Sequence, residues 1–379
     1  MRIELIATTT FGLEAVVKRE IENLGYKILA SENGKITFLG DEFAIARANL
    51  WLRCADRVLV KMAEFTAETF EDLFQFTKGL PWEEWIPIDG EFPVAGTSLK
   101  STLHSVPACQ SIVKKAIVER LKEFYSLDTF EETGAKYQVK VTLLKNRVTL
   151  TMDTSGEALH KRGYRVRDVS APMKETLAAS LVLLSFWNKD KILVDPCCGS
   201  GTIAIEAALI GRNVAPGLNR SFVSEEWEAV RKEVWKTERK KAFDAIDYNN
   251  KLNITAMDID RTAIDAAREN AIEAGVDEDI IFLKKDMTTL FAKEPYGVII
   301  TNPPYGERVG DEKIKNVIYN KLREFYQENP TWSLFMITTD KTVENKIFGK
   351  EADRRRKLYN GRLEACYYQF HGKKPKREN

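Results

Sequence analysis

The stretch Lys191–Ala208, KILVDPCCGSGTIAIEAA, decides the fold of the larger part of this chain. Its apolar run Ile192–Val194 is long enough for a strand buried on both faces, and Asp195 stands where that strand should end. A proline and the turn Gly199–Gly201 follow and lead into an alanine-rich helix. This order places backbone N–H groups and the positive end of a helix dipole beside a bound cofactor. Alone, the pattern is equally typical of an ordinary strand-to-helix turn, so the rest of the chain must decide.

The composition is that of a soluble globular protein with two or three domains. The chain has 379 residues, of which 44% are hydrophobic and 30% are charged. Its formal net charge is +1, so the overall charge does not favour nucleic acid, and any such signal must be local.

The cysteines and the start of the chain predict a cytoplasmic protein. The five cysteines include no C-x-x-C pair, and with three histidines they show no zinc-ligand spacing. An odd, scattered set of cysteines is typical of a reducing compartment. The first residues lead into a strand-like run without a signal peptide, and no stretch approaches about 18 apolar residues. We therefore expect neither a membrane nor a metal as a partner.

Residues 1–65 predict a small module in which strands and helices alternate. Asn33-Gly34 is a strong hairpin turn, and Asp41 is placed to cap a following helix. The expected elements are strands at 2–8, 26–30, 35–39 and 57–65 and helices at 12–24 and 42–51.

A second module is expected over residues 66–155, with helices at 69–77 and 107–125 and paired strands at 137–144 and 147–153. Lys114 and Lys115 lie off the apolar face of the second helix, which is typical of a solvated lysine pair. After this module, four basic residues surround Tyr164: Lys161, Arg162, Arg165 and Arg167. Basic residues interleaved with an aromatic ring suit a phosphate backbone and a stacked base, although a solvated linker has a similar composition.

From Ala171 onward the pattern is that of βαβ units. Strands are expected at 192–194, 253–257, 280–284, 297–300 and 333–338, with a closing hairpin at 358–359 and 363–370. Helices are expected at 172–187, 202–209, 261–274 and 311–327. The highly charged segment 211–250, with Trp227 and Trp235 on an expected helix, is interpreted as an insertion on the surface of this domain.

Four polar side chains stand at the ends of successive expected strands: Asp195, Asp258, Asp286 and Asn302. The carboxyl ends of parallel strands meet at one edge of an open α/β sheet, which is where ligands bind. Any one of these aspartates is more typical of a helix cap. Four in succession, flanked by two special turns, predict a binding site.

Asp258 is placed to accept hydrogen bonds from both ribose hydroxyls of an adenosine. A nicotinamide dinucleotide would be held in the same way, and Gly199-x-Gly201-x-x-Ala204 satisfies its loose fingerprint. The interval from Gly201 to Asp258 exceeds the roughly 20 residues of that fingerprint, although an insertion explains the interval for either cofactor. The sequence at 302–305 separates the two, because a dehydrogenase has no use for it.

The sequence Asn302-Pro303-Pro304-Tyr305 predicts a site for a flat base that carries an amino group. The prolines fix a rigid, extended turn in which the Asn302 oxygen and a backbone carbonyl can accept both amine hydrogens. Two acceptors favour the pyramidal amine whose lone pair can attack a methyl group, and the proton leaves afterwards, so no strong base is needed. Tyr305 supplies a ring for stacking, and if the ring alone matters, Tyr305→Phe should be nearly silent.

The chain resembles the class I methyltransferases that use S-adenosylmethionine, with DPCCGSGT as motif I and NPPY as motif IV. The fuller TNPPYGER, with APMKETLA (Ala171–Ala178) ahead of it, is similar to the THUMP-containing RNA guanine-N2 methyltransferases. The similarity extends to the methyltransferase half that forms N2-methylguanosine in bacterial 23S rRNA. STLHSVPACQSIVKKAI (Ser101–Ile117) resembles the signature of THUMP, an RNA-binding module that follows a ferredoxin-like domain. A second methyltransferase domain, fused C-terminally in some relatives, is not expected here.

The resemblance implies a Rossmann-like class I methyltransferase domain at 156–379, preceded by an α+β RNA-binding region with a ferredoxin-like domain at 1–65 and THUMP at 66–155. It implies that Asp195, Gly199 and Gly201 line the methionine end of the donor. It also implies that Asp258 binds the ribose and Asp286 the adenine amine. The expected S-adenosylmethionine site comprises Asp195, Pro196, Cys197, Gly199, Ser200, Gly201, Thr202, Asp258, Ile259, Asp286, Met287 and Asn302. The expected catalytic residues are Asn302, Pro303, Pro304 and Tyr305, and the expected RNA contacts are Ser101, His104, Lys114, Lys115, Lys161, Arg162 and Arg165.

Methylation of guanine N2 in RNA, most sharply in 23S rRNA, is the function that these features favour. A tRNA guanine-N2 methyltransferase would share both THUMP and NPPY. NPPY also occurs in adenine-N6 methyltransferases, including DNA enzymes, but a THUMP-like module suits structured RNA better than duplex DNA. A catalytically silent RNA-binding or ribosome-assembly factor is disfavoured, because every motif position that the chemistry needs is filled.

Overall fold

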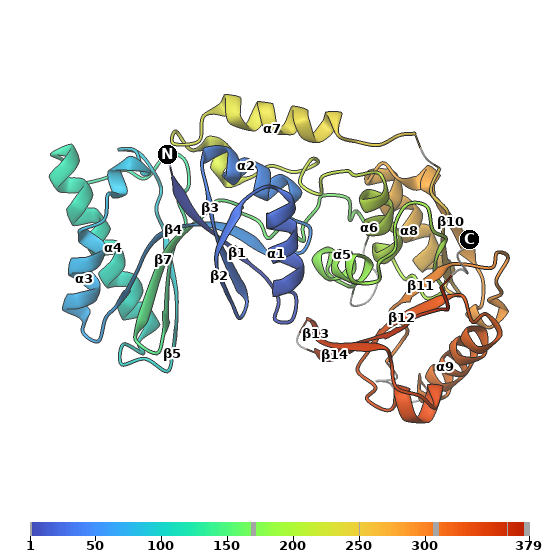
Figure 1. Ribbon diagram of the computed structural model, residues 1–379. Helices are drawn as coiled ribbons and strands as arrows, with labels where there is room; N and C mark the ends of the chain where they lie inside the picture. Colours follow the sequence, from blue (N-terminus) through green and yellow to red (C-terminus); the bar gives the residue numbers. More distant parts are fainter. Residues whose placement is uncertain (1, 168–171, 250, 306–310, 362, 375–379) are drawn as a thin grey trace. The chain divides into compact units, whose positions relative to one another are not determined.

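The computed structural model describes residues 2–167, 172–249, 251–305, 311–361 and 363–374, which form two compact units (Figure 1). Unit 1 comprises Met1–Thr9, Val17–Leu159 and Arg220–Lys241, and unit 2 comprises Thr10–Val16, His160–Asn219 and Ala242–Asn379. Each unit is built on a seven-stranded sheet. In the part of the chain so described, no helix is long and apolar enough to cross a membrane.

The sheet of unit 1 has the strand order β2-β3-β1-β4-β7-β6-β5. The strands are β1 (Ile3–Thr8), β2 (Lys27–Glu32), β3 (Lys35–Gly40), β4 (Arg57–Thr66), β5 (Val94–Leu99), β6 (Val139–Leu144) and β7 (Arg147–Asp153). The helices in this part of the chain are α1 (Glu14–Asn23), α2 (Glu42–Trp51), α3 (Phe70–Lys78) and α4 (Val106–Tyr125), with a short turn η1 (Trp82–Glu84). Because β4 pairs with both β1 and β7, one sheet runs through the two modules expected from the sequence.

Local sequence signals set several of these boundaries. The Asp41 carboxylate accepts a hydrogen bond from the Ala44 N–H at 2.9 Å and caps α2. The hairpin expected at Asn33-Gly34 is confirmed, since it joins β2 to β3. Strand β5 was not predicted from the sequence, because VAGTSL contains a glycine and two small polar residues and shows no apolar alternation.

The charged segment around Trp227 belongs to unit 1, which corrects its interpretation as a surface insertion. Trp227 is only 2% exposed, and its ring stacks on Tyr137 with 4.9 Å between the ring centroids. It follows the short turn η2 (Val223–Glu226) rather than lying on a helix. Trp235, on α7 (Lys232–Asp244), is also buried and stacks on Phe222. The charged residues around both tryptophans made the segment resemble a solvated helix and concealed its buried side.

The sheet of unit 2 has the order β10-β9-β8-β11-β12-β14-β13. Its strands are β8 (Leu193–Asp195), β9 (Ile254–Asp258), β10 (Ile280–Lys284), β11 (Val298–Thr301), β12 (Ser333–Thr338), β13 (Arg354–Asn360) and β14 (Leu363–Phe370). The first five in spatial order are parallel, and β14 and β13 are added antiparallel. The chain leaves the central strand β8 in one direction to β9 and later in the other to β11. Such a reversal opens a crevice at the carboxyl ends of the strands.

The helices of unit 2 are α5 (Glu175–Leu184), α6 (Thr202–Gly211), α8 (Arg261–Glu273) and α9 (Asp311–Glu328), with short 3-10 turns η3 (Asp277–Asp279) and η4 (Met287–Thr289) and a short π-helix η5 (Val343–Phe348). Helix α5 packs on α6, and α8 packs on β9 and β10. Tyr319, Leu322 and Phe325 of α9 bury their side chains in one core cluster with Ile299 and Leu334. The expected α/β architecture is confirmed, and β13 is longer than its sequence pattern indicated.

Candidate active site

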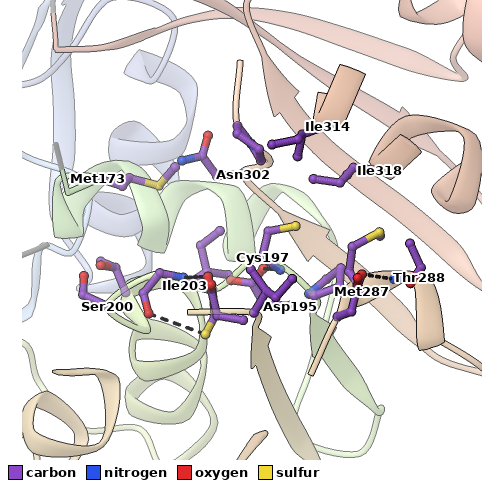
Figure 2. Close-up of a pocket in the computed structure, with 18 of the residues that line it drawn as sticks. Met173, Asp195, Cys197, Ser200, Ile203, Met287, Thr288, Asn302, Ile314 and Ile318 are labelled. Carbon is purple, nitrogen blue, oxygen red and sulfur yellow. Dashed lines mark hydrogen bonds between the residues drawn. The ribbon is translucent and has the colours of Figure 1, made fainter. Parts of the chain in front are cut away.

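A cavity of about 650 Å³ opens at the carboxyl edge of the parallel strands in unit 2 (Figure 2). Its lining comes from the segments that end β8, β9, β10 and β11, together with α9 and the approach to α5. The lining includes these residues named from the sequence: Asp195, Pro196, Cys197, Gly199, Ser200, Thr202, Asp258, Ile259, Asp286, Met287, Asn302 and Pro304. Three further predicted residues lie outside the lining: Gly201, Pro303 and Tyr305.

The two glycines of the loop after β8 serve different needs. Gly199 and Gly201 have φ angles of 53° and 81°, in the left-handed region that favours glycine. A Cβ atom on Gly201 would lie 2.9 Å from the Cβ of Ala267, so glycine allows α6 to approach α8 closely. The N–H of Gly199 donates to Oδ2 of Asp258 at 2.9 Å. The loop is thereby joined to the end of β9.

Asp195 is a fully buried carboxyl group at the end of β8. Its Oδ1 accepts the N–H of Cys197 at 3.2 Å; its Oδ2 makes no hydrogen bond of normal geometry among the described residues, although the Thr301 hydroxyl is close enough to lower the pKa of the carboxyl group. Burial raises the pKa of Asp195 to about 7, and the nearby negative charge of Asp258 acts in the same direction. A cation placed beside Oδ2 would favour the ionised form.

Asp258 and Asp286 take part in local turns and also face the cavity. Asp258 accepts the N–H groups of Gly199 and Asp260, each at 2.9 Å. Asp286 caps η4 by accepting the N–H of Thr288 at 2.9 Å. A carboxylate offers about four acceptor positions, so both groups keep acceptor capacity for a ligand. Within the described ranges, no three His, Cys, Asp or Glu side chains form a group that could hold a metal ion.

Asn302 and Tyr305 are joined by a short hydrogen bond. The Tyr305 hydroxyl donates to Oδ1 of Asn302 at 2.6 Å and accepts from Nδ2 of Asn360 at 3.3 Å. This contact fixes the amide plane of Asn302. It leaves one of the two lone pairs of Oδ1 available to accept another hydrogen bond. The sequence predicts a role only for the ring of Tyr305, because the contact of its hydroxyl depends on how the proline turn folds. Residues 306–308 of the TNPPYGER motif lie outside the described residues.

Several lining residues were missed from the sequence: Pro172, Met173, Cys198, Ile203, Thr288, Lys313, Ile314, Val317 and Ile318. Ile314 and Val317 are 56% and 53% exposed, and both contribute apolar surface to the cavity. Figure 2 shows Ile314 and Ile318 of α9 on the same side of the cavity as Asn302. The signal available in the sequence was the i, i+3, i+4 spacing of Ile314, Val317 and Ile318.

Three of the expected RNA contacts are on or near the surface. Ser101 and His104 precede α4 in unit 1, and His104 is exposed. The Ser101 hydroxyl accepts the N–H of Asn146 at 3.0 Å, which ties two loops together. Lys161 is exposed in unit 2. A role in RNA binding stays a prediction for all three residues.

The two lysines expected to contact RNA from α4 lie near aromatic rings of unit 1. Nζ of Lys114 lies 2.5 Å from Oε1 of Glu132 and 3.4 Å above the centroid of the Phe92 ring. Nζ of Lys115 lies 5.8 Å from the centroid of the Phe74 ring. Lys114 thus has a structural role inside unit 1, and an RNA contact by either lysine stays a prediction.

Arg162 is buried and Arg165 is largely buried, which argues against their expected contact with RNA. The Arg162 side chain is 3% exposed and lies 3.5 Å from the carboxylate of Glu206. The Arg165 side chain is 14% exposed and pairs with Glu175 at 2.8 Å. A guanidinium that is buried against a carboxylate is held there by the cost of separating the charges. The pattern of basic residues could not reveal this, because Glu206 of α6 is far from Arg162 in the sequence, and nothing local indicates that Arg165 pairs with Glu175 at the start of α5, ten residues away.

Three known domain families match most of the chain. The RMKL-like methyltransferase domain, UPF0020, matches residues 162–369. The RlmL ferredoxin-like domain matches residues 4–59, and the THUMP domain matches residues 67–153.

Two curated relatives are similar along nearly the whole chain. One is the "Putative RNA methyltransferase YpsC" of Bacillus subtilis, 49% identical over 99% of this chain and 97% of that protein. The other is the ribosomal RNA large subunit methyltransferase K/L of Syntrophotalea carbinolica, 34% identical over 97% of this chain and 53% of that protein. The chain therefore spans about half the length of the K/L relative.

Two solved structures share the fold over nearly the whole chain. One, from Listeria monocytogenes, is described as a predicted N6-adenine-specific DNA methylase; it is 49% identical, covers 98% of this chain and 97% of its own, and has a TM-score of 0.94. The other, SMU.472, was solved as a putative methyltransferase complexed with SAH; it is 42% identical, covers 99% of each chain and has a TM-score of 0.93. Together with the family matches, these similarities show that the chain belongs to the RMKL-like methyltransferase family, with an RlmL-type ferredoxin-like domain and a THUMP domain ahead of a class I methyltransferase domain.

Proposed function

We propose that this chain transfers a methyl group from S-adenosylmethionine to the exocyclic N2 amine of a guanosine in RNA, and that 23S rRNA is the substrate. The observation that carries the proposal is the position and orientation of the Asn302 amide. It lines a cavity that suits the donor, and its oxygen is held in one orientation by Tyr305.

The cavity suits S-adenosylmethionine in three parts. The buried Oδ2 of Asp195 suits the α-ammonium group of the methionine end. The remaining acceptor positions of Asp258 suit two ribose hydroxyls. Asp286 suits the adenine amine, and Ile259 and Met287 supply apolar surface for the ring. When bound, the donor supplies an electrophilic methyl carbon on a sulfonium. The SAH complex of SMU.472 supports this choice of donor.

The target amine is held by Asn302 and the backbone carbonyl of Pro303. Tyr305 uses one lone pair of Oδ1 of Asn302, and the other accepts an amine hydrogen. The amine nitrogen attacks the methyl carbon, the carbon–sulfur bond breaks towards sulfur, and the amine then loses a proton to solvent. Positive charge develops on the nitrogen during attack, so both acceptors stabilise the transition state more than the ground state.

RNA as the substrate is supported by the THUMP domain at residues 67–153 and by the name of the Bacillus subtilis relative. Large-subunit rRNA is supported by the K/L relative, of which this chain spans about half. The Listeria structure is described as an adenine-N6 DNA enzyme, and the geometry at Asn302 serves an adenine amine as well as a guanine amine. The identity of the methylated nucleoside is therefore the decisive observable.

The test incubates the full chain with isotopically labelled S-adenosylmethionine and total RNA from cells that lack the gene. The RNA is then separated by size and digested to nucleosides. We expect labelled N2-methylguanosine in the 23S fraction, and none with the Asn302→Ala variant. Label in the tRNA fraction would show that the substrate is tRNA and not 23S rRNA. Label in N6-methyladenosine or in added DNA would refute guanine methylation of RNA.

A further inference from the structure

Arg165 joins two segments that line the cavity. Its Nη1 donates to the hydroxyl of Ser200 at 3.1 Å, and its Nη2 donates to the hydroxyl of Thr202 at 3.2 Å and to the carbonyl of Met173 at 3.0 Å. Ser200 and Thr202 belong to the glycine loop, and Met173 precedes α5; all three line the cavity. The Nε of Arg165 donates to the Glu175 carboxylate at 2.8 Å, which holds the guanidinium in place.

Asn270 of α8 holds the same loop from a second direction. It is fully buried, and its Nδ2 donates to the carbonyls of Ser200 at 3.3 Å and Arg167 at 3.1 Å. Its Oδ1 accepts the N–H groups of Val166 at 3.0 Å and Arg167 at 3.2 Å. The backbone next to Arg165 is thus fixed to α8, which restricts where its guanidinium can lie.

We propose that Arg165 is a positioning residue for the methyl donor: it fixes Ser200 and Thr202 in the glycine loop and thereby sets donor affinity. The inference rests on the proposed use of S-adenosylmethionine. The planar fork of an arginine can reach both hydroxyls, the Met173 carbonyl and the Glu175 carboxylate at once, whereas a lysine ammonium cannot. Arg165 is 14% exposed, so its side chain offers little surface to an RNA phosphate.

Arg167 provides the matched control. It lies two residues further along the same segment, carries the same charge, and pairs with Glu269 at 3.0 Å with its side chain 44% exposed. If the segment acted through its positive charge on RNA, the exposed Arg167 should matter at least as much as Arg165. If Arg165 acts on the donor loop, only Arg165 should alter donor affinity.

The test is calorimetric titration of the full-length chain with S-adenosylhomocysteine. Arg165→Lys removes the hydrogen bonds to two hydroxyls and keeps the charge, and we expect the Kd to rise about tenfold. Arg167→Lys should leave the Kd within about twofold of the wild-type value. In a Ser200→Ala/Thr202→Val background, Arg165→Lys should raise the Kd by less than about a further twofold, because the two hydroxyls through which Arg165 acts are absent. RNA affinity, measured with total rRNA, should be equal in the wild-type chain and Arg165→Lys.

A wild-type Kd for Arg165→Lys would overturn the inference, and so would an equal tenfold effect in the Ser200→Ala/Thr202→Val background. A loss of RNA affinity without a change in donor affinity would show that Arg165 serves RNA binding and not donor binding. If Arg165→Lys does not fold, Arg165→Gln carries the test with the same expected and contrary results. Failure of the wild-type chain to bind S-adenosylhomocysteine would refute the proposed donor itself. That outcome differs from failure of the role of Arg165, in which the wild-type chain still binds S-adenosylhomocysteine.

Discussion

Replacing Tyr305 with phenylalanine keeps the ring and removes the hydroxyl that orients Asn302. The hydrogen bond is 2.6 Å long and joins two uncharged side chains, so its net contribution is about 0.5–1.5 kcal/mol. Because Oδ1 of Asn302 is proposed to accept a hydrogen of the target amine in the transition state, this loss should fall on the rate of methyl transfer. We expect Tyr305→Phe to slow that step by about 2- to 13-fold. This result would differ from the nearly silent substitution expected if only the ring of Tyr305 matters.

The assay is single-turnover methyl transfer at saturating donor and RNA. Asn360→Ala is the matched variant, because it removes the 3.3 Å bond to the Tyr305 hydroxyl and keeps Tyr305 itself, and it should slow the step less than Tyr305→Phe. Tyr305→Ala should slow it further, since stacking of a base on an aromatic ring contributes roughly 1–3 kcal/mol. A wild-type rate for Tyr305→Phe would show that the hydroxyl does not orient Asn302. A loss of donor affinity of the same size would place Tyr305 in the donor site instead.

Three further outcomes are expected. Asp258→Ala should weaken binding of S-adenosylhomocysteine by roughly 1–3 kcal/mol, because the two ribose hydroxyls that Asp258 is proposed to bind would lose their acceptor; unchanged calorimetric affinity in a folded variant would refute that role. The pKa of Asp195 rises from an ordinary 3.8 to about 7 on folding, so its stabilising contribution is full below about pH 4 and is lost as pH rises to about 7. Denaturant unfolding at pH 5 and pH 8 should therefore show a fall in stability that Asp195→Asn removes, and an equal fall in both chains would contradict the burial argument. Trp227→Ala should destabilise the full chain by about 3–5 kcal/mol, because the buried ring fills unit 1 beside Tyr137; a change below about 1 kcal/mol would mean that the segment 220–241 adds little to that core.

The cavity was predictable from the sequence where short-range signals fix both an element and its end. Asp195, Asp258, Asp286 and Asn302 each follow an apolar run, and parallel strands bring such ends to one edge. The glycine loop was predictable for the same reason, because its left-handed turns require glycine. Each of these signals lies within a few residues of the side chain that it places.

The remainder depends on long-range packing that no local pattern encodes. Arg162 was expected on a surface, yet it is buried beside Glu206, more than 40 residues away. Trp227 lies among charged residues, and nothing near it indicates that its ring stacks on Tyr137. The Tyr305 hydroxyl reaches Asn302 only because the proline turn closes on itself. In each case the partner is set by tertiary structure, so the residue type was visible in the sequence and its role was not.

The most direct test of the central claim is the single-turnover rate of Asn302→Ala at saturating donor and RNA. The amide oxygen is proposed to accept a hydrogen of the target amine as positive charge develops on it. Removing one such preorganised group should slow methyl transfer on the order of 10²–10³-fold and leave the affinity for S-adenosylhomocysteine unchanged. A wild-type rate would exclude Asn302 from the mechanism, and a loss of donor affinity as large as the loss of rate would show that Asn302 only shapes the turn.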